Sequence, residues 1–282
     1  MLYVVGTPIG NLGDLSPRGR EALERCDFIA AEDTRVTGKL LHYFDIHTPL
    51  VSYHEHNRRQ RGEEILRRLL AGEHCALVTD AGMPAISDPG EDLVALCHAN
   101  GVPVESVPGP TAFATALAVS GFPSGRFTFE GFLTVNKRGR REHLLSLAAE
   151  PRTMLFYEAP HKLPATLRDF AEHFGDRPLA IVRELTKIHE QVILTTASEA
   201  AARYADGALK GEIVLVLAGC PPAETAPVPL EDAAALARSY ASDGLPPSEA
   251  ARRAAKETGR PKGEIYRLLA ASAHPDAEEA SP

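Results

Sequence analysis

The chain has 282 residues, of which 44% are hydrophobic and 24% are charged, a composition typical of soluble globular proteins with sizeable cores. No apolar run approaches the roughly 18 residues of a membrane-spanning helix, and the first residues lack the features of a signal peptide, so we expect a cytoplasmic protein without a membrane anchor. The net charge of −8 excludes a uniformly basic nucleic-acid-binding protein, although local basic patches can still bind RNA.

The first part of the chain alternates short apolar runs with helical patterns. This alternation predicts a mostly parallel sheet covered by helices on both faces, because parallel strands are joined by helical crossovers. The expected strands are Leu2–Gly6, Asp27–Ala31, Pro49–Ser52, Cys75–Thr79 and Val102–Val107, and the expected helices are Ser16–Arg25, Val36–Phe44, Asn57–Ala71, Glu91–Asn100 and Thr111–Ser120.

A Gly/Pro-rich junction at Gly121–Gly125 leads into a second set of elements. Two strands in this set follow one another without an intervening helix, which predicts a mixed, partly antiparallel sheet. The expected strands are Arg126–Phe132, Thr153–Tyr157, Leu179–Glu184, Gln191–Leu194 and Glu212–Leu217, and the expected helices are Arg140–Ala149, Leu163–Phe174 and Ser198–Tyr204.

The last part of the chain follows a Pro-rich linker, Cys220–Pro229. Its helical patterns cover Leu230–Ala241, Pro247–Thr258 and Lys262–Ala271, with a break between the last two that is typical of a helix-turn-helix. We therefore predict an α/β protein with domains over residues 1–120 and 121–220, and a helical appendage over residues 230–273 that could bind RNA.

Four loops that follow predicted strands are rich in Gly and Pro. In an open α/β sheet, ligands bind beyond the carboxyl ends of the strands, where Gly lets the backbone approach a ligand and Pro fixes the loop shape. The first loop has neither the GxGxxG nor the GxxxxGK[ST] pattern, so the sequence favours a cofactor without phosphate groups. The loops are Gly6–Asp14, Asp80–Gly90, Pro108–Thr111 and the segment that follows Tyr157.

The sequence gives no support for a metal site or a disulfide framework. The four cysteines lie far apart and form no CxxC pair. The cluster His54–His56 lacks the HExxH spacing and a clear third ligand, so we expect no bound metal.

Three clusters of cationic residues could contact RNA phosphates. Each could equally be a solvated helix face, which is the ordinary role of a charge run. The residues that we assign to RNA binding are Arg58, Arg59, Lys137, Arg138, Arg140, Arg141, Arg252, Arg253 and Lys262.

Six motifs stand in a fixed order along the chain: GTPIGNLGD at Gly6–Asp14, AAEDTR at Ala30–Arg35, DAGMPAISDPG at Asp80–Gly90, PGPTA at Pro108–Ala112, FYEAPHKL at Phe156–Leu163 and RELTKIHE at Arg183–Glu190. Together they resemble the tetrapyrrole-methylase superfamily and, within it, a branch that methylates small-subunit ribosomal RNA. The resemblance spans about Met1–Gly219. It implies two α/β domains with S-adenosylmethionine in the cleft between them, a homodimer, and methylation of a decoding-centre cytidine of 16S rRNA on its ribose 2′-oxygen.

The resemblance also implies which residues surround the cofactor. The second loop would hold its methionine part and ribose, while Phe156, Tyr157 and the strand near Glu212 would close over the adenine. The residues assigned in this way are Pro8, Asp80, Ala81, Gly82, Pro84, Ile86, Ser87, Asp88, Pro108, Thr111, Phe156, Tyr157 and Glu212.

Methyl transfer from a sulfonium requires an acceptor oxygen placed in line, and a nearby base or cation helps to remove its proton. Lys187 with Glu184 could lower the pKa of the hydroxyl and accept its proton, or both could belong to a structural ion-pair network with Arg183. Eight residues remain open for this role: Glu32, Asp33, Arg35, Asp88, Glu158, His161, Glu184 and Lys187. We single out Glu184, Lys187, Asp88 and Arg35 as catalytic candidates, although Arg35 could equally hold a phosphate and Asp33 could cap a helix.

Two other functions remain open. A methyltransferase of the same fold could act on a tetrapyrrole or another small molecule, because cofactor loops do not determine the acceptor. A ribosome-assembly factor could bind RNA without catalysis, although the complete set of loops argues against it.

Overall fold

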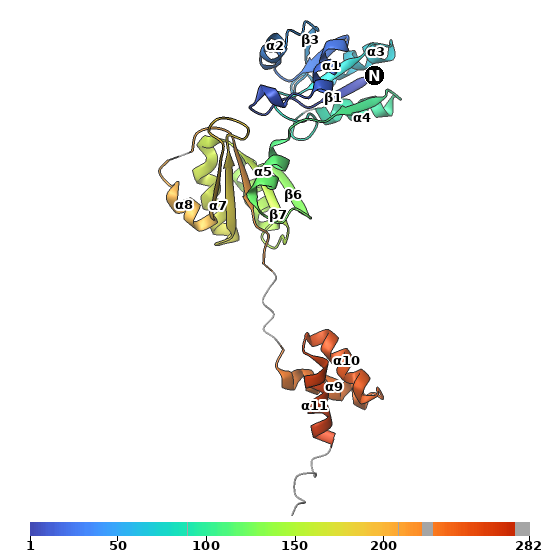
Figure 1. The fold of residues 1–282 in the computed structure, drawn as a ribbon, viewed down its shortest axis with the longest axis vertical. Coiled ribbons are helices and arrows are strands. Elements are labelled where there is room, and N and C mark those ends of the chain that lie inside the picture. Colours follow the sequence, from blue (N-terminus) through green and yellow to red (C-terminus); the bar gives the residue numbers. More distant parts are fainter. Residues whose placement is uncertain (89, 208, 222–227, 274–282) are drawn as a thin grey trace, which may run out of the picture. The chain divides into compact units, whose positions relative to one another are not determined.

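The computed structural model describes residues 1–88, 90–207, 209–221 and 228–273. The chain forms two compact units, Met1–Pro221 and Pro222–Pro282. Among the described residues, the first unit contains two five-stranded sheets with their helices, and the second contains three helices (Figure 1). Six residues of the predicted linker, 222–227, lie outside the described residues.

The first sheet is parallel throughout, as predicted, with the strand order β3-β2-β4-β1-β5. The apolar runs of β1, β2 and β4 are buried almost completely, which is the pattern of strands covered on both faces. The strands are β1 (Leu2–Val5), β2 (Phe28–Ala31), β3 (Leu50–Ser52), β4 (Cys75–Val78) and β5 (Val104–Val107).

Helices cover both faces of this sheet. Leu23 and Leu41 bring α1 and α2 onto one face, and Ile65 and Leu93 bring α3 and α4 onto the other. The helices are α1 (Pro17–Arg25), α2 (Thr34–Tyr43), α3 (Arg58–Leu70) and α4 (Gly90–Ala99), with the short 3-10 helix η1 (Leu12–Asp14) in the first loop.

The starts of α1 and α2 are fixed by the residues that precede them. Ser16 Oγ accepts a hydrogen bond from Gly19 N at 2.9 Å, and Pro17 stands at the first helical position, as predicted. Asp33 caps α2 through a hydrogen bond from Arg35 N at 2.8 Å.

The second sheet is mixed, as predicted, with the strand order β6-β7-β10-β8-β9. Only β6 and β7 pair in parallel, and the other three pairs are antiparallel. The strands are β6 (Phe127–Phe132), β7 (Thr153–Glu158), β8 (Pro178–Arg183), β9 (Gln191–Thr196) and β10 (Ile213–Leu217).

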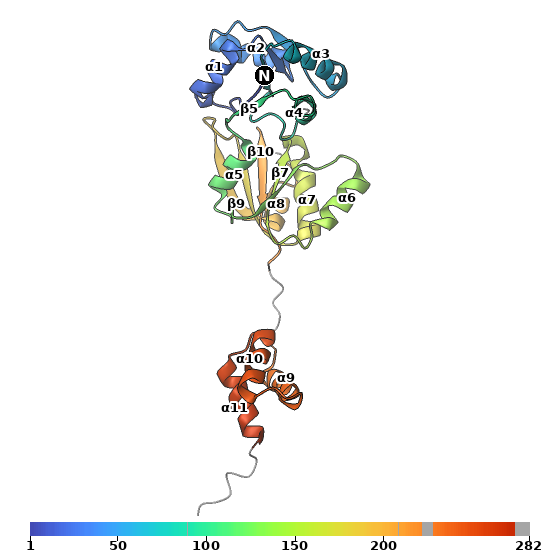
Figure 2. The ribbon, with the colours of Figure 1, turned by 90° about the vertical axis from the view of Figure 1, so that its right-hand side faces the viewer.

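Helix α5 (Ala112–Ser120) packs on one face of the second sheet through Ala116 and Leu117. The opposite face is covered by α6 (Lys137–Ser146), α7 (Leu163–Phe174) and α8 (Ala197–Arg203), and the two layers of helices are seen in Figure 2. Because α5 belongs to the core of the second sheet, it favours a domain boundary before this helix instead of at Ser120. The division into three domains remains a prediction.

The described part of the second unit is a cluster of three helices around an alanine-rich core that includes Ala237, Ala254 and Ile265. The helices are α9 (Leu230–Ser242), α10 (Pro247–Thr258) and α11 (Lys262–Ala273), which agree with the predicted ranges to within two residues. No helix among the described residues is long and apolar enough to span a membrane.

Candidate active site

The strand order of the first sheet determines where a ligand can bind. The chain crosses from β1 to β2 over one face of the sheet and from β4 to β5 over the other face. Because β1 and β4 are neighbouring strands, the loops that follow them diverge from each other. Such a switch point is where open α/β sheets bind ligands. In the second sheet β10 runs antiparallel to β7 and β8, so its first residues lie beside the last residues of those strands.

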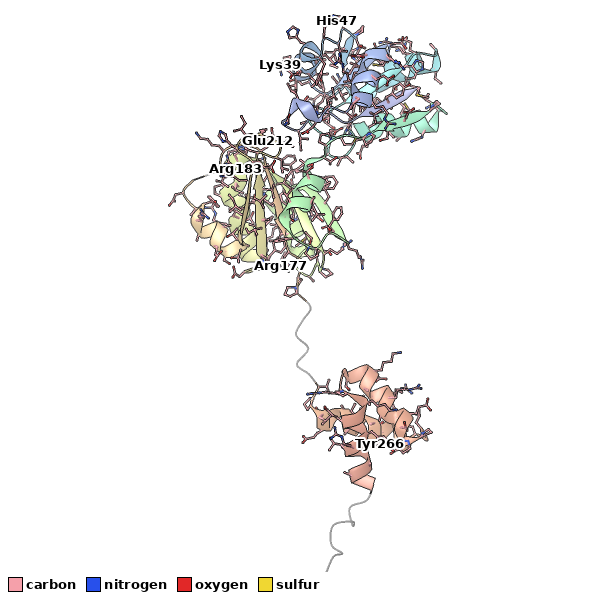
Figure 3. All side chains as sticks on the ribbon, viewed as in Figure 1. Lys39, His47, Arg177, Arg183, Glu212 and Tyr266 are labelled. Atoms are coloured by element: carbon pink, nitrogen blue, oxygen red, sulfur yellow. The ribbon has the colours of Figure 1, made fainter. Side chains whose placement is uncertain are left out.

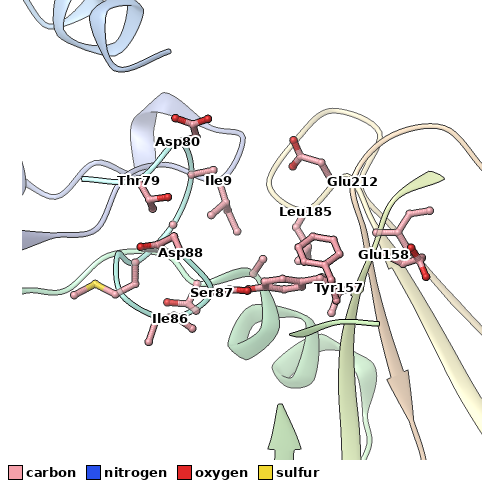
Figure 4. Close-up of a pocket in the computed structure, with 18 of the residues that line it drawn as sticks. Ile9, Thr79, Asp80, Ile86, Ser87, Asp88, Tyr157, Glu158, Leu185 and Glu212 are labelled. Carbon is pink, nitrogen blue, oxygen red and sulfur yellow. The ribbon is translucent and has the colours of Figure 1, made fainter. Parts of the chain in front are cut away.

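These two edges enclose a cavity of about 470 Å³ (Figure 4). The first sheet contributes residues from the loops after β1, β2, β4 and β5, and the second contributes strand ends. The lining residues used below are Ile9, Glu32, Thr79, Asp80, Ala81, Gly82, Ile86, Ser87, Asp88, Thr111, Phe132, Tyr157, Glu158, Leu185, Glu212 and Val214.

The wall from the first sheet is built by loops that touch through their backbones. A Cβ on Gly6 would lie 2.6 Å from both Cα and N of Gly109, so the loops after β1 and β5 approach more closely than a side chain permits. The loops after β1 and β4 form a two-residue bridge, in which Thr7 N donates to Gly82 O at 2.9 Å and Gly82 N donates to Thr7 O at 3.1 Å. The glycines therefore make this wall possible.

The loop after β4 is held in shape by Asp88. Its Oδ1 accepts hydrogen bonds from Ala85 N at 2.8 Å and Gly90 N at 3.2 Å, and Ala85 has a φ of 65°, which L-residues rarely adopt. Burial raises the pKa of the Asp88 carboxyl, against the effect of these two amide donors. Asp88 therefore both shapes the loop and presents a carboxylate to the cavity.

The wall from the second sheet is built by side chains at strand ends. The Tyr157 ring points into the cavity and packs edge-on against Phe129 and at a tilt against Phe132, with centroids 4.9 and 5.4 Å apart (Figure 4). Glu158, the next residue, turns away from the cavity, since its carboxylate accepts hydrogen bonds from Ala159 N and from Thr166 Oγ1. This carboxylate is therefore already engaged and is a poor candidate for the base.

The cavity is acidic. Its described lining residues include five acidic residues, of which only Glu158 turns its carboxylate away, and no Lys, Arg or His. Burial raises the pKa of Asp80, and the neighbouring charge of Glu32 raises it further. Glu32 accepts a hydrogen bond from Thr79 Oγ1 at 2.7 Å, and Asp80 accepts one from Asp33 N at 3.0 Å. A lining of this kind favours a cationic ligand and disfavours phosphate.

The RELTKIHE motif forms a tight loop between β8 and β9. Glu184 and Thr186 have φ values of 53° and 66°, and for a β-branched residue such a φ is strained by about 1–3 kcal/mol. Glu184 Oε1 accepts hydrogen bonds from Lys187 Nζ and from Glu212 N, each at 3.0 Å, and Lys187 Nζ lies 3.3 Å from Glu212 Oε2. These hydrogen bonds lower the pKa of Glu184, the Glu212 amide contributing most.

The same loop rests on the loop that follows β1. A Cβ on Gly10 would lie 2.7 Å from Lys187 Cγ and 2.9 Å from Leu185 O, so Gly10 is the point where these two loops touch. Arg183, which could have joined a structural network with Glu184, instead donates to Lys210 O and to Gln191 Oε1. The ion pairs of this loop are therefore those of Lys187 with Glu184 and Glu212.

Nine of the thirteen residues that the sequence assigned to the cofactor line the cavity. The other four do not: Phe156 is fully buried in the core on the opposite face of β7, Pro108 borders a second, shallower hollow, and neither Pro8 nor Pro84 reaches the lining. The nine are Asp80, Ala81, Gly82, Ile86, Ser87, Asp88, Thr111, Tyr157 and Glu212.

Of the four catalytic candidates, Asp88 lines the cavity, Glu184 and Lys187 stand beside Glu212, and Arg35 lies apart from them. Arg35 donates to both oxygens of Asp33, at 3.0 and 2.6 Å, and its side chain is 87% exposed. The pKa of Asp33 is lowered to about 2, mainly because its carboxylate accepts these hydrogen bonds from the Arg35 side chain. Arg35 is thus a solvent-facing cation near the site.

Several lining residues were not assigned to the cofactor from the sequence. Ile9 and Leu185 lie inside the GTPIGNLGD and RELTKIHE motifs, and Phe132 and Val214 lie on predicted strands. All four are apolar residues of the kind that an ordinary core also contains. Glu32 was recognised only as one of several candidate bases. The position of each follows from the pairing of strands, which was not predicted strand by strand.

The basic clusters are largely neutralised by acidic neighbours. Arg140, only 15% exposed, is bound to Asp169 at 2.5 Å and to Thr166 Oγ1 at 2.7 Å, so its guanidinium is part of the fold. Arg59, Lys137 and Arg141 form no salt bridge within the part of the chain that the structure describes. Pairs with Glu or Asp involve Arg58, Arg138, Arg252 and Arg253, while Lys262 donates to Ser248 Oγ.

Within the described residues, no group of three or more His, Cys, Asp or Glu side chains is arranged to hold a metal ion. The cysteines are free, and Cys26, Cys75 and Cys97 are buried.

Solved structures with this fold are known. The chain superposes with a TM-score of 0.55 on uroporphyrin-III C-methyl transferase from Thermus thermophilus, complexed with S-adenyl homocysteine, at 20% identity over 77% of this chain and 96% of that chain. It superposes with a TM-score of 0.58 on a cobalt precorrin-4 methyltransferase, at 20% identity over 77% and 94% of the two chains. At this identity, the likeness establishes the fold.

Sequence comparison identifies the family. The family model for tetrapyrrole (corrin/porphyrin) methylases matches residues 1–201. The chain is 49% identical to a Synechocystis protein named ribosomal RNA small subunit methyltransferase I, over 95% of this chain and 96% of the relative, and 42% identical to one from Escherichia coli O157:H7, over 94% and 93%. The chain therefore belongs to the tetrapyrrole methylase family, in the group that contains the proteins named ribosomal RNA small subunit methyltransferase I.

Proposed function

We propose that this protein transfers a methyl group from S-adenosylmethionine to the ribose 2′-oxygen of a decoding-centre cytidine in 16S rRNA. The observation that carries the proposal is the acidic, phosphate-excluding cavity at the switch point of a methylase fold. The names of the relatives support ribosomal RNA as the acceptor, and the position on the ribose rests on the motif resemblance.

The residues of the cavity fit this cofactor. Its sulfonium and ammonium groups are cationic and would be attracted by Asp80, Asp88 and Glu32, which line the cavity. Ile9, Leu185 and Tyr157 offer apolar surface for the adenine, and Ala81 and Gly82 expose backbone groups that can bind polar edges.

When bound, S-adenosylmethionine supplies a methyl group on a positively charged sulfur, which leaves with the electron pair of the broken bond. The residues of this chain then need to hold the acceptor oxygen in line and receive its proton. We assign Lys187 and Glu212 to the acceptor side, since Glu212 lines the cavity and its carboxylate is 3.3 Å from the Lys187 ammonium. The ammonium favours the ionised hydroxyl, and the carboxylate accepts the proton.

Glu184 has a positioning role in this mechanism. Its Oε1 already accepts hydrogen bonds from Lys187 Nζ and from Glu212 N, so it holds both partners of the acceptor side. Asp88 shapes the cofactor loop through its two amide donors. Arg35 is exposed, is paired with Asp33, and is suited to contact an RNA phosphate.

RNA is bound, in this proposal, by the cations that acidic neighbours leave free and by the helical unit at the end of the chain. Arg59, Lys137 and Arg141 are the candidates in the first unit, and Lys262 at the start of α11 is one in the second. The resemblance also suggests a homodimer that works in the cytoplasm with the small ribosomal subunit. Light scattering during size-exclusion chromatography tests the dimer.

The decisive experiment is nucleoside mass spectrometry of 16S rRNA from cells with and without the gene. Loss of one 2′-O-methylated cytidine, restored by the purified protein with S-adenosylmethionine, is the expected result. Unchanged rRNA together with methylation of a tetrapyrrole in vitro would favour a small-molecule methyltransferase. Failure to bind S-adenosylmethionine in calorimetry would favour a non-catalytic assembly factor.

A further inference from the structure

The loop that carries the RELTKIHE motif exposes one apolar side chain beside the cavity. Ile188 is 97% exposed, the most exposed large hydrophobic residue among those that the structure describes. Leu185, three residues earlier, lines the cavity, and Lys187 is paired with Glu212 at its edge. Figure 4 shows Leu185 and Glu212 together on the second-sheet side of the cavity, and Figure 3 shows Arg183 and Glu212 at the end of that sheet facing the first.

The loop holds Ile188 in a defined place instead of letting it fold back onto the protein. Thr186 N donates to Glu190 Oε2 at 2.6 Å, Lys187 N to Glu184 O at 3.0 Å, and Glu190 N to Lys187 O at 3.0 Å. Gly10, from the loop after β1, packs against Leu185 and Lys187 from the other side. Hydrogen bonds therefore hold Lys187 before Ile188 and Glu190 after it, and the Ile188 side chain is exposed to solvent.

We propose that Ile188 contacts the base of the acceptor nucleotide and holds it out of its RNA stack while its ribose enters the cavity. This inference rests on the proposed function and adds a specificity-determining residue to it. Enzymes that act on a base gain access by taking it out of its stack, and apolar side chains serve as wedges when proteins unstack bases. Ile188 follows directly after Lys187, whose ammonium is 3.3 Å from the carboxylate of Glu212, a residue that lines the cavity.

The surroundings favour RNA over a protein partner. Stable protein interfaces bury about 1,200 Å² or more in total, far beyond what one isoleucine contributes. A single base is of the right size, and the position of Ile188 next to Lys187 places it on the side of the cavity that we assign to the acceptor. A second copy of this chain is the competing occupant, and it becomes an outcome of the test.

The test compares Ile188→Ala with the matched control Leu194→Ala, which removes another exposed aliphatic side chain, 66% exposed, on β9. Single-turnover methylation of small subunits from cells lacking the gene is measured at several subunit concentrations, with S-adenosylmethionine affinity and melting temperature measured in parallel. We expect Ile188→Ala to lower kcat/KM for the subunit by about tenfold to hundredfold, while cofactor affinity and melting temperature stay unchanged. Ile188→Leu restores most of the activity, and Leu194→Ala is active like the wild type.

Four results would overturn the inference. Wild-type kcat/KM in Ile188→Ala shows that the side chain does not meet the acceptor. A change in the oligomeric state of Ile188→Ala would show that Ile188 contacts a second copy of the chain. Weakened binding of S-adenosylmethionine by this variant would show that Ile188 contacts the cofactor. If the wild-type protein itself binds S-adenosylmethionine yet methylates no subunit, the proposed function fails, and this inference fails with it.

Discussion

The two walls of the cavity are built in different ways. The wall from the first sheet consists of loop backbone and carboxylates, and its shape depends on glycines at points of contact such as Gly6 and Gly109. The wall from the second sheet consists of side chains at strand ends, such as Tyr157, Phe132 and Val214, whose shape depends on packing. We therefore expect the first wall to be sensitive to the smallest backbone change and the second to tolerate changes that preserve shape.

The largest effect is expected from Gly6→Ala. The new Cβ would lie 2.6 Å from backbone atoms of Gly109, so the loops after β1 and β5 have to separate. We expect a loss of about 1–3 kcal/mol in the free energy of unfolding, with little remaining affinity for S-adenosylmethionine. Chemical denaturation and calorimetry measure the two effects.

The control for this prediction is Gly125→Ala, because a Cβ on Gly125 meets no atom within 4 Å. This variant should match the wild type in both measurements. Equal behaviour of the two alanine variants would show that the close approach of the loops does not determine the first wall.

Asp88→Ala tests the carboxylate of the first wall. It removes the acceptor for Ala85 N and Gly90 N, and hydrogen bonds to a charged group contribute about 1.5–3 kcal/mol each. We expect methyl transfer to disappear and cofactor affinity to fall by about a hundredfold, while circular dichroism still reports a folded protein. Asp88→Asn keeps an oxygen that can accept these bonds, so its methyl transfer and cofactor affinity should lie between those of the wild type and Asp88→Ala. The control is Glu91→Ala, which removes an exposed acid in the first turn of α4 and should leave both quantities unchanged.

The sequence predicted the first wall far better than the second. Gly and Pro in loops such as Asp80–Gly90 are tied to local backbone shape, so these loops can be located without knowing which strands pair, although Pro8, Pro84 and Pro108 themselves do not reach the lining. Phe156 and Tyr157 illustrate the limit: both are aromatic, and only the register of β7 with β10 decides that one enters the core and the other the cavity. Arg140 shows the same limit, because its partners Thr166 and Asp169 lie on α7.

The acidic character of the first wall predicts how cofactor binding depends on pH. The pKa of both Asp80 and Asp88 is raised in the free protein, mainly by burial. A bound cation stabilises the ionised carboxylates, so binding releases protons and weakens as the pH falls through these raised pKa values. Calorimetry across roughly pH 4–7 should show affinity that decreases toward acid.

Asp80→Asn supplies the comparison for this pH dependence. It removes one titrating group, so the slope of affinity against pH should become shallower. An unchanged slope would mean that Asp80 does not sense the cofactor charge, and a slope of opposite sign would contradict a cationic ligand altogether.

The smallest effect is expected at the second wall, from Tyr157→Phe. The lost hydroxyl accepts only a long hydrogen bond, from Phe113 N at 3.4 Å, while the ring that packs on Phe129 and Phe132 is retained. We expect cofactor affinity within about threefold of the wild type, because a weak neutral hydrogen bond contributes little net free energy. Tyr157→Ala removes the ring itself and should weaken binding by about tenfold or more. If Tyr157→Phe is as damaging as Tyr157→Ala, the hydroxyl itself binds the ligand, and the second wall works through a polar contact as the first does.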